Sequence, residues 1–508
     1  MSQRTKKSSA RADKKPARPA AARERTDKRR ARKPAGGPDE PLQWGSQRDM
    51  NALEALMWRA EADPRLRSTI VALELLDRVP EWDRYLAAHD WATRLIPRFR
   101  MKVTEPLMGV GRPSWTVDED FDLSYHVRRV ALPAPGTFSD LLAAAQQVAM
   151  TPFDKHRSPW ESVLVEGLPD GGAAFVLKLH HATTDGIGAT QLLGLLHSRT
   201  REHNPDKPQP PAPVPDGGSA MTTLSRQAST DVRAIAGAAG QLLRGAGALR
   251  RPDRAASDVA RYAASLRRVL ADAGGDPSPL LSGRSLSWRF SAIDVAFADL
   301  RAAAKAAGGS LNDAFIASLL GGFRRYHDEL GCPVPTIPVA MPISVRREGD
   351  AEGGNRFVAA RFAGPVAIKD PVKRIAAMSR IVREARGEPA IEGMSLATPL
   401  LSRLPGVLIA QLAGGLTTGN DLQASNVPGL REDVFLAGAR IERAYPFAPL
   451  PGCAAMIALV SHRDQCCIGV NIDPAAITDP QRFDRCLVEG FSEVLALHPG
   501  AGRPLLRA

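Results

Sequence analysis

An apolar run that ends in two histidines and a tight turn constrains this chain more than any other part of the sequence. The run at residues 174–179 is short, apolar and preceded by two glycines, which is typical of a β-strand. HHATTDGI follows at residues 180–187, and leucines then recur at helical spacing within residues 192–196. The sequence therefore predicts a strand, a turn that carries both histidines, and a helix.

The two histidines should differ in their surroundings, because successive strand residues point to opposite faces. His181 falls on the face of the apolar residues Phe175, Leu177 and Leu179, and His180 falls on the other face. The ordinary pKa of histidine, about 6.5, makes its ring a suitable base near neutral pH. The pattern therefore indicates His181 as a candidate general base, with His180 beside it in the candidate catalytic site.

The HHxxxDG pattern at residues 180–186 resembles the motif of the CoA- and carrier-dependent acyltransferases. That superfamily includes chloramphenicol acetyltransferase, the condensation domains of nonribosomal peptide synthesis, and the bacterial wax ester synthase/diacylglycerol acyltransferases. Other segments, in chain order, are similar to signatures of this last family: PRFR (97–100), PFDK (152–155), SPWE (158–161), LNDA (311–314), GNRF (354–357) and SNVPG (425–429). The resemblance runs from about residue 44 to the C-terminus.

The resemblance implies an α/β fold of two chloramphenicol-acetyltransferase-like sandwich domains with a tunnel between them. Acyl-CoA would enter from one side and the acceptor alcohol from the other. The implied activity is transfer of a long-chain acyl group from acyl-CoA to diacylglycerol, a long-chain alcohol, or both. We expect no cofactor beyond the co-substrate acyl-CoA, and no metal.

A thioester is already activated, so the chemistry needs only a base and a donor for the tetrahedral oxyanion. His181 would be the base, and no acyl-enzyme would form. Asp185, next to Gly186 in the turn, is the third candidate of the catalytic set and could orient His181 as the acid of a triad. The resemblance instead implies that Asp185 pairs with an arginine, which we assign to Arg346. Three oxyanion or acceptor candidates remain open: Asn312, Ser425 and Asn426. The pair Asn312-Asp313 stands where a helix is expected to begin, so capping of that helix is its alternative role.

Changes in composition divide the chain into four parts. Residues 1–40 carry 14 Lys/Arg and 5 Asp/Glu, a net charge of +9, and Leu42 is the first large aliphatic or aromatic residue. Such a segment buries no apolar area, so we expect a disordered basic tail. An N-terminal acyltransferase domain would follow at residues 41–203, a proline-rich linker with amphipathic helices at 204–275, and a C-terminal acyltransferase-like domain at 276–508.

The charge pattern also bears on partners. The whole chain has a net charge of +12, so residues 41–508 carry only about +3 and indicate no nucleic-acid partner. The apolar substrates implied by the resemblance favour a cytoplasmic enzyme associated peripherally with a membrane or lipid droplet. The tail is either a solubilising appendage or a contact for anionic lipid. The five cysteines form no CxxC pair, which fits a reducing compartment.

Two alternatives stay open. The first is an HHxxxDG acyltransferase with a different acceptor, such as a polyketide or a carrier-bound intermediate. The second is a catalytically silent lipid-binding paralogue, although His181 and Asp185 are both present. The sequence does not distinguish diacylglycerol from a fatty alcohol, since both acceptors require similar apolar tunnels.

Overall fold

The computed structural model describes residue 45 and residues 47–106, 112–214, 275–344, 355, 357–386 and 419–508. The expected basic tail at residues 1–40 lies outside the described residues. So do the expected amphipathic helices after residue 214, and so does Arg346. Predictions for these segments therefore remain predictions.

The first sheet is built around the strand that carries the histidines. It has six strands in the order β11-β12-β1-β6-β5-β4, and only β4 and β5 run parallel. Strand β6, expected from the apolar run, lies between β1 and β5 with every residue buried. The strands are β1 (Thr69–Leu76), β4 (Val127–Ala131), β5 (Trp160–Glu166), β6 (Ala173–His180), β11 (Phe435–Leu436) and β12 (Ala439–Phe447).

Strand β12 comes from the second half of the chain but belongs to the first sheet. It pairs antiparallel with β1, from Val71 opposite Phe447 to Leu76 opposite Ile441. Its bounds fall inside the segment expected to form a separate C-terminal domain at residues 276–508. The division at residue 276 therefore does not separate the two sheets, because the first sheet needs a strand from beyond it.

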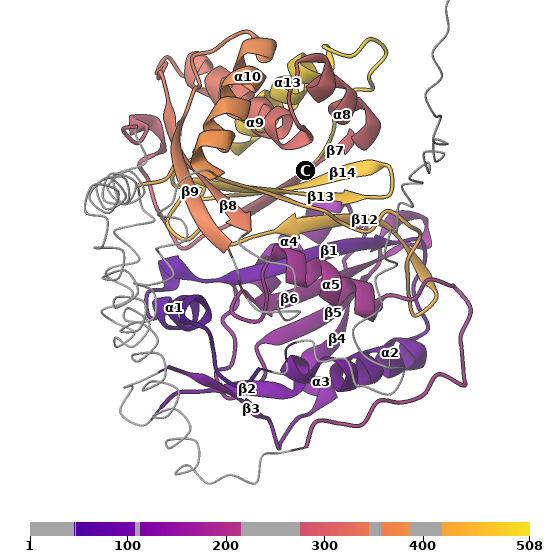
Figure 1. Ribbon diagram of the computed structural model, residues 1–508. Coiled ribbons are helices and arrows are strands. Elements are labelled where there is room, and N and C mark those ends of the chain that lie inside the picture. The colour runs from indigo at the N-terminus through magenta and orange to yellow at the C-terminus, as the bar shows by residue number, and fades with distance from the viewer. Residues whose placement is uncertain are drawn as a thin grey trace, which may run out of the picture. The chain divides into compact units, whose positions relative to one another are not determined.

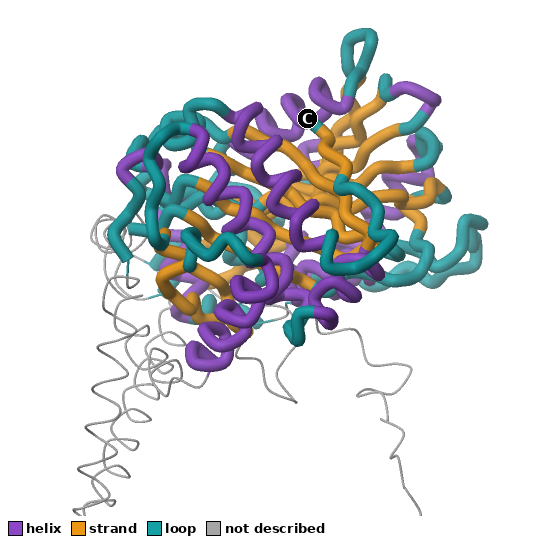
Figure 2. Tube along the Cα trace, turned by 90° about the horizontal axis from the view of Figure 1, so that it is seen from above, coloured by secondary structure: helices purple, strands orange, loops and turns teal. Residues whose placement is uncertain are grey.

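The second sheet has seven strands in the order β15-β7-β14-β13-β10-β8-β9. Helices α8, α9, α10 and α13 lie over one of its faces (Figure 1), and from above the helices are seen to cover the strands (Figure 2). The strands are β7 (Arg289–Ala296), β8 (Ile337–Ser344), β9 (Phe357–Gly364), β10 (Leu422–Val427), β13 (Ala455–His462), β14 (Gln465–Ile472) and β15 (Leu505–Arg507). The helices are α8 (Phe297–Ala306), α9 (Leu311–Glu329), α10 (Pro371–Arg386) and α13 (Pro480–Leu495).

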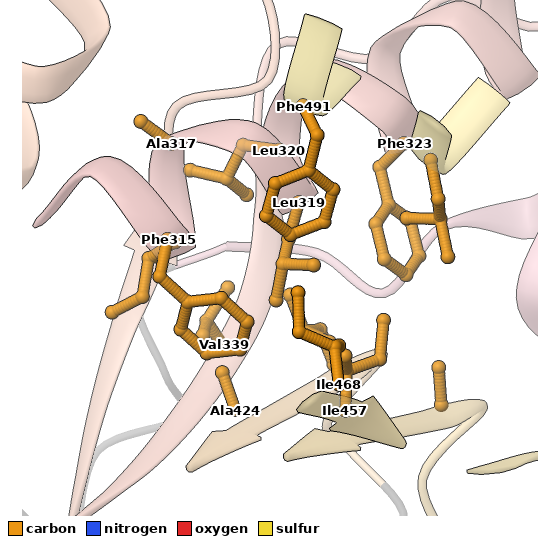
Figure 3. Packing of buried hydrophobic residues seen from close by; sticks show 14 of the residues in the cluster. Phe315, Ala317, Leu319, Leu320, Phe323, Val339, Ala424, Ile457, Ile468 and Phe491 are labelled. Atoms are coloured by element: carbon orange, nitrogen blue, oxygen red, sulfur yellow. The ribbon is translucent and has the colours of Figure 1, made fainter. Parts of the chain in front are cut away.

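Helix α9 forms the centre of the larger hydrophobic core. Phe315, Leu319 and Phe323 of this helix are fully buried and point toward the strands, where they meet Ile457 and Ile468 (Figure 3). Burial on this scale, at about 25 cal/mol per Å² of apolar surface, is the main contribution to folding of this half. This core lies between the second sheet and its helices. The opposite face of the second sheet packs against the first half of the chain.

Helix α4 (Phe138–Met150) joins the two sheets. It contacts β1 and β6 of the first sheet and β7 of the second, and its residues share one hydrophobic cluster with both. A capping box starts the helix, because Thr137 accepts from the backbone of Asp140 and the Asp140 carboxylate accepts from the backbone of Thr137. Around α4, the interface between the sheets is therefore apolar.

Two smaller layers surround the first sheet. Helices α2 and α5 pack on its other face, and a cluster of α1, β2 and β3 packs beneath the histidine turn at Ala182. These elements are α1 (Ala52–Ala60), α2 (Trp82–Leu95), α3 (Leu123–His126), α5 (Gly186–Leu196), β2 (Met101–Thr104) and β3 (Ser114–Val117). Short 3₁₀ turns occupy Pro64–Leu66, Pro97–Arg100, Pro169–Gly171 and Pro279–Leu281.

The start of the proline-rich linker lies along α2. The Trp91 indole donates to the Pro208 carbonyl at 3.0 Å, and the Lys207 ammonium lies 3.2 Å from the centre of the Trp91 ring. Residues 207–214 contain no helix or strand, as expected for an extended segment rich in proline. Within the residues that the structure describes, no helix is long and apolar enough to cross a membrane.

Candidate active site

The turn between β6 and α5 carries the candidate catalytic groups. The His181 backbone N–H donates to the Ser68 carbonyl at 2.7 Å, and the Thr183 N–H donates to the His180 carbonyl at 2.8 Å. These bonds end the β6 ladder and close the tight turn that the sequence predicts. Both histidines are thereby fixed at one end of the central strand.

His180 is fully buried, with a hydrogen bond at one ring nitrogen and a carboxylate close to the other. Its Nδ1 accepts from the Ala182 backbone N–H at 2.9 Å, so the neutral ring carries its proton on Nε2. Nε2 lies 3.2 Å from a carboxylate oxygen of Glu61, and the Trp58 ring meets the imidazole edge-on at 4.9 Å between centres. His180 therefore anchors the turn, and the two histidines have separate surroundings as strand alternation predicts.

Glu61 is a charged partner beneath the turn that the sequence did not indicate. Burial acts to raise its pKa, but His180 and the hydrogen bond from the Ser68 N–H, 2.7 Å long, hold the pKa of Glu61 below its ordinary value. Glu61 therefore stays ionised at neutral pH. Its negative charge favours the N–H of His180 on the Nε2 side.

His181 as a residue is partly exposed, whereas His180 is fully buried. Its Nδ1 lies 3.0 Å from the Asn355 side-chain oxygen, and the Asn355 amide nitrogen donates to the His181 carbonyl at 2.7 Å. Burial lowers the pKa of His181, while a hydrogen bond to the backbone of His181 itself, the Asp185 charge and the Asn355 hydrogen bond oppose that shift. The ring is therefore neutral near pH 7, which is the form that a general base requires.

Asp185 begins the helix that follows the turn. Its side chain caps α5 by accepting from the Gly188 N–H at 2.8 Å, and only 4% of its surface is exposed. Among the described residues, the hydrogen bond at His181 Nδ1 is made with Asn355 and not with Asp185. The pairing of Asp185 with Arg346 stays a prediction, since Arg346 lies outside the described residues.

The SNVPG segment of the second half lies against this turn. A Cβ on Gly186 would come within 2.7 Å of a Val427 methyl group, and the Thr190 hydroxyl donates to the Pro428 carbonyl at 3.0 Å. Gly186 is therefore needed where β10 approaches the turn. Strand alternation puts Ser425 on the same face as Val427, and it puts Asn426 on the face of the core residue Ala424.

Asn312 lies near the start of α9. Its side-chain amide lies 3.5 Å from the Met341 sulfur of β8, a strand of the second sheet. Ser310 caps this helix and Asp313 completes the capping box, so Asp313 of the expected Asn312-Asp313 pair takes part in the cap and Asn312 does not. Of the three oxyanion candidates, Ser425 is the one whose strand face is turned toward the histidine turn.

Two further groups hold the outside of the turn. Arg98, buried to 1% exposure, donates to the carbonyls of Ala182 and Thr183 at 3.3 Å each. Its guanidinium lies 3.5 Å from the Glu54 carboxylate and covers the Trp115 ring. Arg98 and Asn355 both lie in segments that resemble family signatures, and that resemblance was the only available signal for their role.

Comparison with known proteins identifies the family that the sequence motifs resemble, and the matches cover most of the chain. Residues 48–315 match the family described as the wax ester synthase/diacylglycerol acyltransferase catalytic domain, and residues 353–494 match the WS/DGAT C-terminal domain. The chain is 41% identical over 465 residues to the Mycobacterium tuberculosis protein named "Putative diacyglycerol O-acyltransferase Rv2484c", covering 91% of this chain and 94% of that protein.

Solved structures agree on the fold. The wax ester synthase/diacylglycerol acyltransferase from Marinobacter aquaeolei VT8 matches with a TM-score of 0.58 at 21% identity, covering 88% of this chain and 98% of that one. The first condensation domain of the calcium-dependent antibiotic synthetase matches with a TM-score of 0.57 at 15% identity, covering 89% and 96%. The two-sheet, chloramphenicol-acetyltransferase-like fold is thereby confirmed. This chain belongs to the wax ester synthase/diacylglycerol acyltransferase family, and it is an acyltransferase.

Proposed function

We propose that this acyltransferase moves a long-chain acyl group from acyl-CoA to the hydroxyl of diacylglycerol or of a long-chain alcohol. The proposal rests on the family to which the chain belongs and on His181, a partly exposed residue at the end of β6 whose lowered pKa keeps its ring neutral near pH 7. It is the histidine of the turn that is not buried as an anchor. The proposed substrates would reach it through a tunnel between the two halves.

The reaction needs one proton shuttle and no covalent enzyme intermediate. A ring nitrogen of His181 takes the hydroxyl proton while the alcohol oxygen bonds to the thioester carbon, giving a tetrahedral oxyanion. The C–S bond then breaks, the carbonyl re-forms as the ester, and the imidazolium returns the proton to the CoA sulfur. We favour the Ser425 hydroxyl as the oxyanion donor, because its strand face is turned toward the turn.

The pH dependence follows from the direction of the His181 pKa shift. The pKa of His181 lies below the ordinary value of 6.5. The rate should therefore rise with pH up to this lowered pKa and reach a plateau above it. A base that remained protonated at neutral pH would give a plateau displaced to higher pH. The dependence of kcat/KM on pH measures the pKa of this base in the free enzyme.

The decisive assay supplies purified full-length protein with labelled palmitoyl-CoA and either diacylglycerol or hexadecanol. The rate of the His181→Ala variant should be lower than that of the wild type by about 10²- to 10⁴-fold. With either protein, no labelled acyl group should become attached to the enzyme. Wild-type rates with the two acceptors decide between triacylglycerol and wax ester as the product. Full activity of His181→Ala, or a labelled protein intermediate, contradicts the mechanism.

We also propose that the basic segment at residues 1–40 holds the enzyme at an anionic lipid surface. Its support is the net charge of +9, since each basic residue near such a surface contributes about 1 kcal/mol. Deletion of residues 1–40 should weaken sedimentation with phosphatidylserine vesicles at low salt and spare turnover of detergent-dispersed substrate. Equal sedimentation of the truncated and full chains would make the segment a solubilising appendage.

A further inference from the structure

Asn355 reaches the candidate active site from the second half of the chain, and each of its polar groups is engaged. Its side-chain amide contacts the ring and the carbonyl of His181. Its backbone N–H donates to Glu54 at 3.3 Å, and its carbonyl accepts from the Asn51 side chain at 3.2 Å. With 4% of its surface exposed, Asn355 is fixed between α1 and the turn.

These contacts determine which way the Asn355 amide faces. The His181 carbonyl can only accept a hydrogen bond, so the group 2.7 Å from it must be the NH₂ of Asn355. The Asn355 oxygen then faces His181 Nδ1 at 3.0 Å, and an oxygen there requires a proton on Nδ1. In the neutral ring the lone pair consequently lies on Nε2.

A buried ion pair connects Asn355 to the outside of the same turn. Glu54 accepts from the Asn355 backbone and lies 3.5 Å from Arg98, which in turn donates to the carbonyls of Ala182 and Thr183. The carboxylate and guanidinium side chains are each 1% exposed. Both sides of the histidine turn are therefore held by one connected set of groups.

We propose that Asn355 is a positioning residue that keeps the His181 proton on Nδ1 and makes Nε2 the nitrogen that receives the acceptor proton. The proposal rests on the proposed function, because it assigns the nitrogen for that proton transfer. It also gives the second half of the chain a part in the chemistry, since Asn355 lies 174 residues beyond His181. Without Asn355, the ring would keep the hydrogen bond to its own backbone as a weaker restraint and would be freer to rotate and to place its proton on either nitrogen.

The charged groups around His181 define what a change at Asn355 can do. Asp185 and His180 act on the ring electrostatically from the turn, and Glu54 contacts Asn355 from α1. Asn355→Asp keeps an oxygen on the Nδ1 side, adds a negative charge and loses the donor to the His181 carbonyl. Asn355→Leu keeps the approximate shape of the side chain and removes both of its hydrogen bonds.

The first experiment measures the tautomer directly and needs no turnover. Ring ¹H–¹⁵N correlation spectra of the full chain labelled with ¹⁵N-histidine at pH 7.5 distinguish a protonated from an unprotonated ring nitrogen. His181→Ala identifies the signals of His181 among those of the ten histidines. We expect a protonated Nδ1 and an unprotonated Nε2 in the wild type, and mixed signals in Asn355→Leu. A wild-type ring with its proton on Nε2 overturns the proposal.

The second experiment measures kinetics with labelled palmitoyl-CoA and diacylglycerol or hexadecanol. Asn355→Leu should lower kcat by about 10²-fold with little change in the KM for acyl-CoA, because the base is misplaced and the donor site is intact. Asn355→Asp should move the rising limb of the pH profile upward by about one unit, since a carboxylate beside the ring favours imidazolium. It should therefore recover activity over Asn355→Leu at high pH.

Asn471→Asp is the matched control for this chemical change. Asn471 is a fully buried residue of β14, away from the histidine turn. Its side-chain amide donates to the Ala448 carbonyl at 2.9 Å. The control should lower thermal stability without moving the pH limb or the tautomer signals. Asn355 variants whose pH limb and ring signals match the wild type overturn the proposal. Full activity of His181→Ala would instead overturn the proposed function, and the wild-type spectrum would still report on Asn355.

Discussion

At the scale of single residues, the two adjacent histidines have different tasks because their ring nitrogens have different partners. His180 is enclosed by Glu61, Trp58 and the Ala182 N–H, and His181 is a partly exposed residue that contacts Asn355. A buried ring with a partner close to each nitrogen supports structure. A partly exposed histidine with an orienting partner is available to chemistry.

Substitution should therefore separate stability from activity. His180→Ala should destabilise the protein by about 3 kcal/mol, because it leaves a cavity and removes the buried partner of Glu61. His181→Ala should cost less stability but most of the activity. Thermal unfolding and acyl transfer, measured on the same preparations, check both expectations. Equal stability losses in the two variants would contradict the separation.

Buried histidines should also make the protein sensitive to mild acid. Burial lowers the pKa of His89 to about 4, where it bonds to Ser162 and to the Tyr85 carbonyl. The unfolded chain takes up the proton near pH 6.5 and the folded chain does so only near 4. Stability is therefore complete above about 6.5 and falls as the pH drops toward 4, by about 3 kcal/mol for this group.

Unfolding in urea at pH 7.5 and pH 5 measures this loss. The His89→Gln variant should be less stable than the wild type at pH 7.5 and should show a smaller difference between the two pH values. Other buried histidines with lowered pKa values, His126, His327 and His462, will retain part of the dependence. A wild type equally stable at both pH values would show that the folded state takes up these protons readily.

At the scale of elements, the turn and β10 fit together only because Gly186 lacks a side chain. A Cβ there would come within 2.7 Å of the Val427 methyl group. Gly186→Ala should destabilise by about 1–3 kcal/mol and lower activity, since one of the two elements must shift. Val427→Ala removes the opposing methyl groups and should restore part of both losses in the double variant.

This rescue distinguishes a steric fit from a requirement for backbone freedom. Thermal unfolding and acyl transfer should be measured for both single variants and for the double variant. A double variant no better than the sum of the two single variants would show that Val427 is not the obstacle. Val427→Ala alone serves as the control, because it should cost stability without the loss of activity seen for Gly186→Ala.

At the scale of the whole molecule, the halves are joined by shared strands and by a buried polar cluster. Asp294 of β7 accepts from the Tyr445 hydroxyl of β12 at 2.7 Å and from Arg507 of β15 at 2.8 Å. The C-terminal strand, the second sheet and the strand donated to the first sheet therefore meet at one carboxylate. The sheets should unfold together.

Removing that carboxylate should weaken the whole molecule. Asp294→Ala should cost about 3 kcal/mol, because a buried hydroxyl and two arginines, Arg443 and Arg507, lose their partner. Tyr445→Phe should cost about 1 kcal/mol. Urea unfolding followed by tryptophan fluorescence and by far-UV circular dichroism measures both. The two probes should give coincident single transitions. Separate transitions for the two probes in the wild type would show that the sheets are independent.

The sequence by itself determined the local unit that carries the chemistry. Apolar period, paired glycines and leucine spacing are properties of neighbouring residues, so they predicted β6, the histidine turn and α5. Alternation along a strand also separated His180 from His181. The recurring signatures identified the family, and with it the two-sheet fold.

Only the tertiary structure decided what holds the turn and where the halves divide. Glu61, Arg98 and Asn355 come from separate segments, and no periodicity relates them to the histidines. Strand β12 likewise joins a sheet whose other main strands precede it by more than 250 residues. Local patterns report how a residue relates to its neighbours in the chain. Contacts between distant segments depend on how complete elements pack, and this packing sets the partners of each catalytic group.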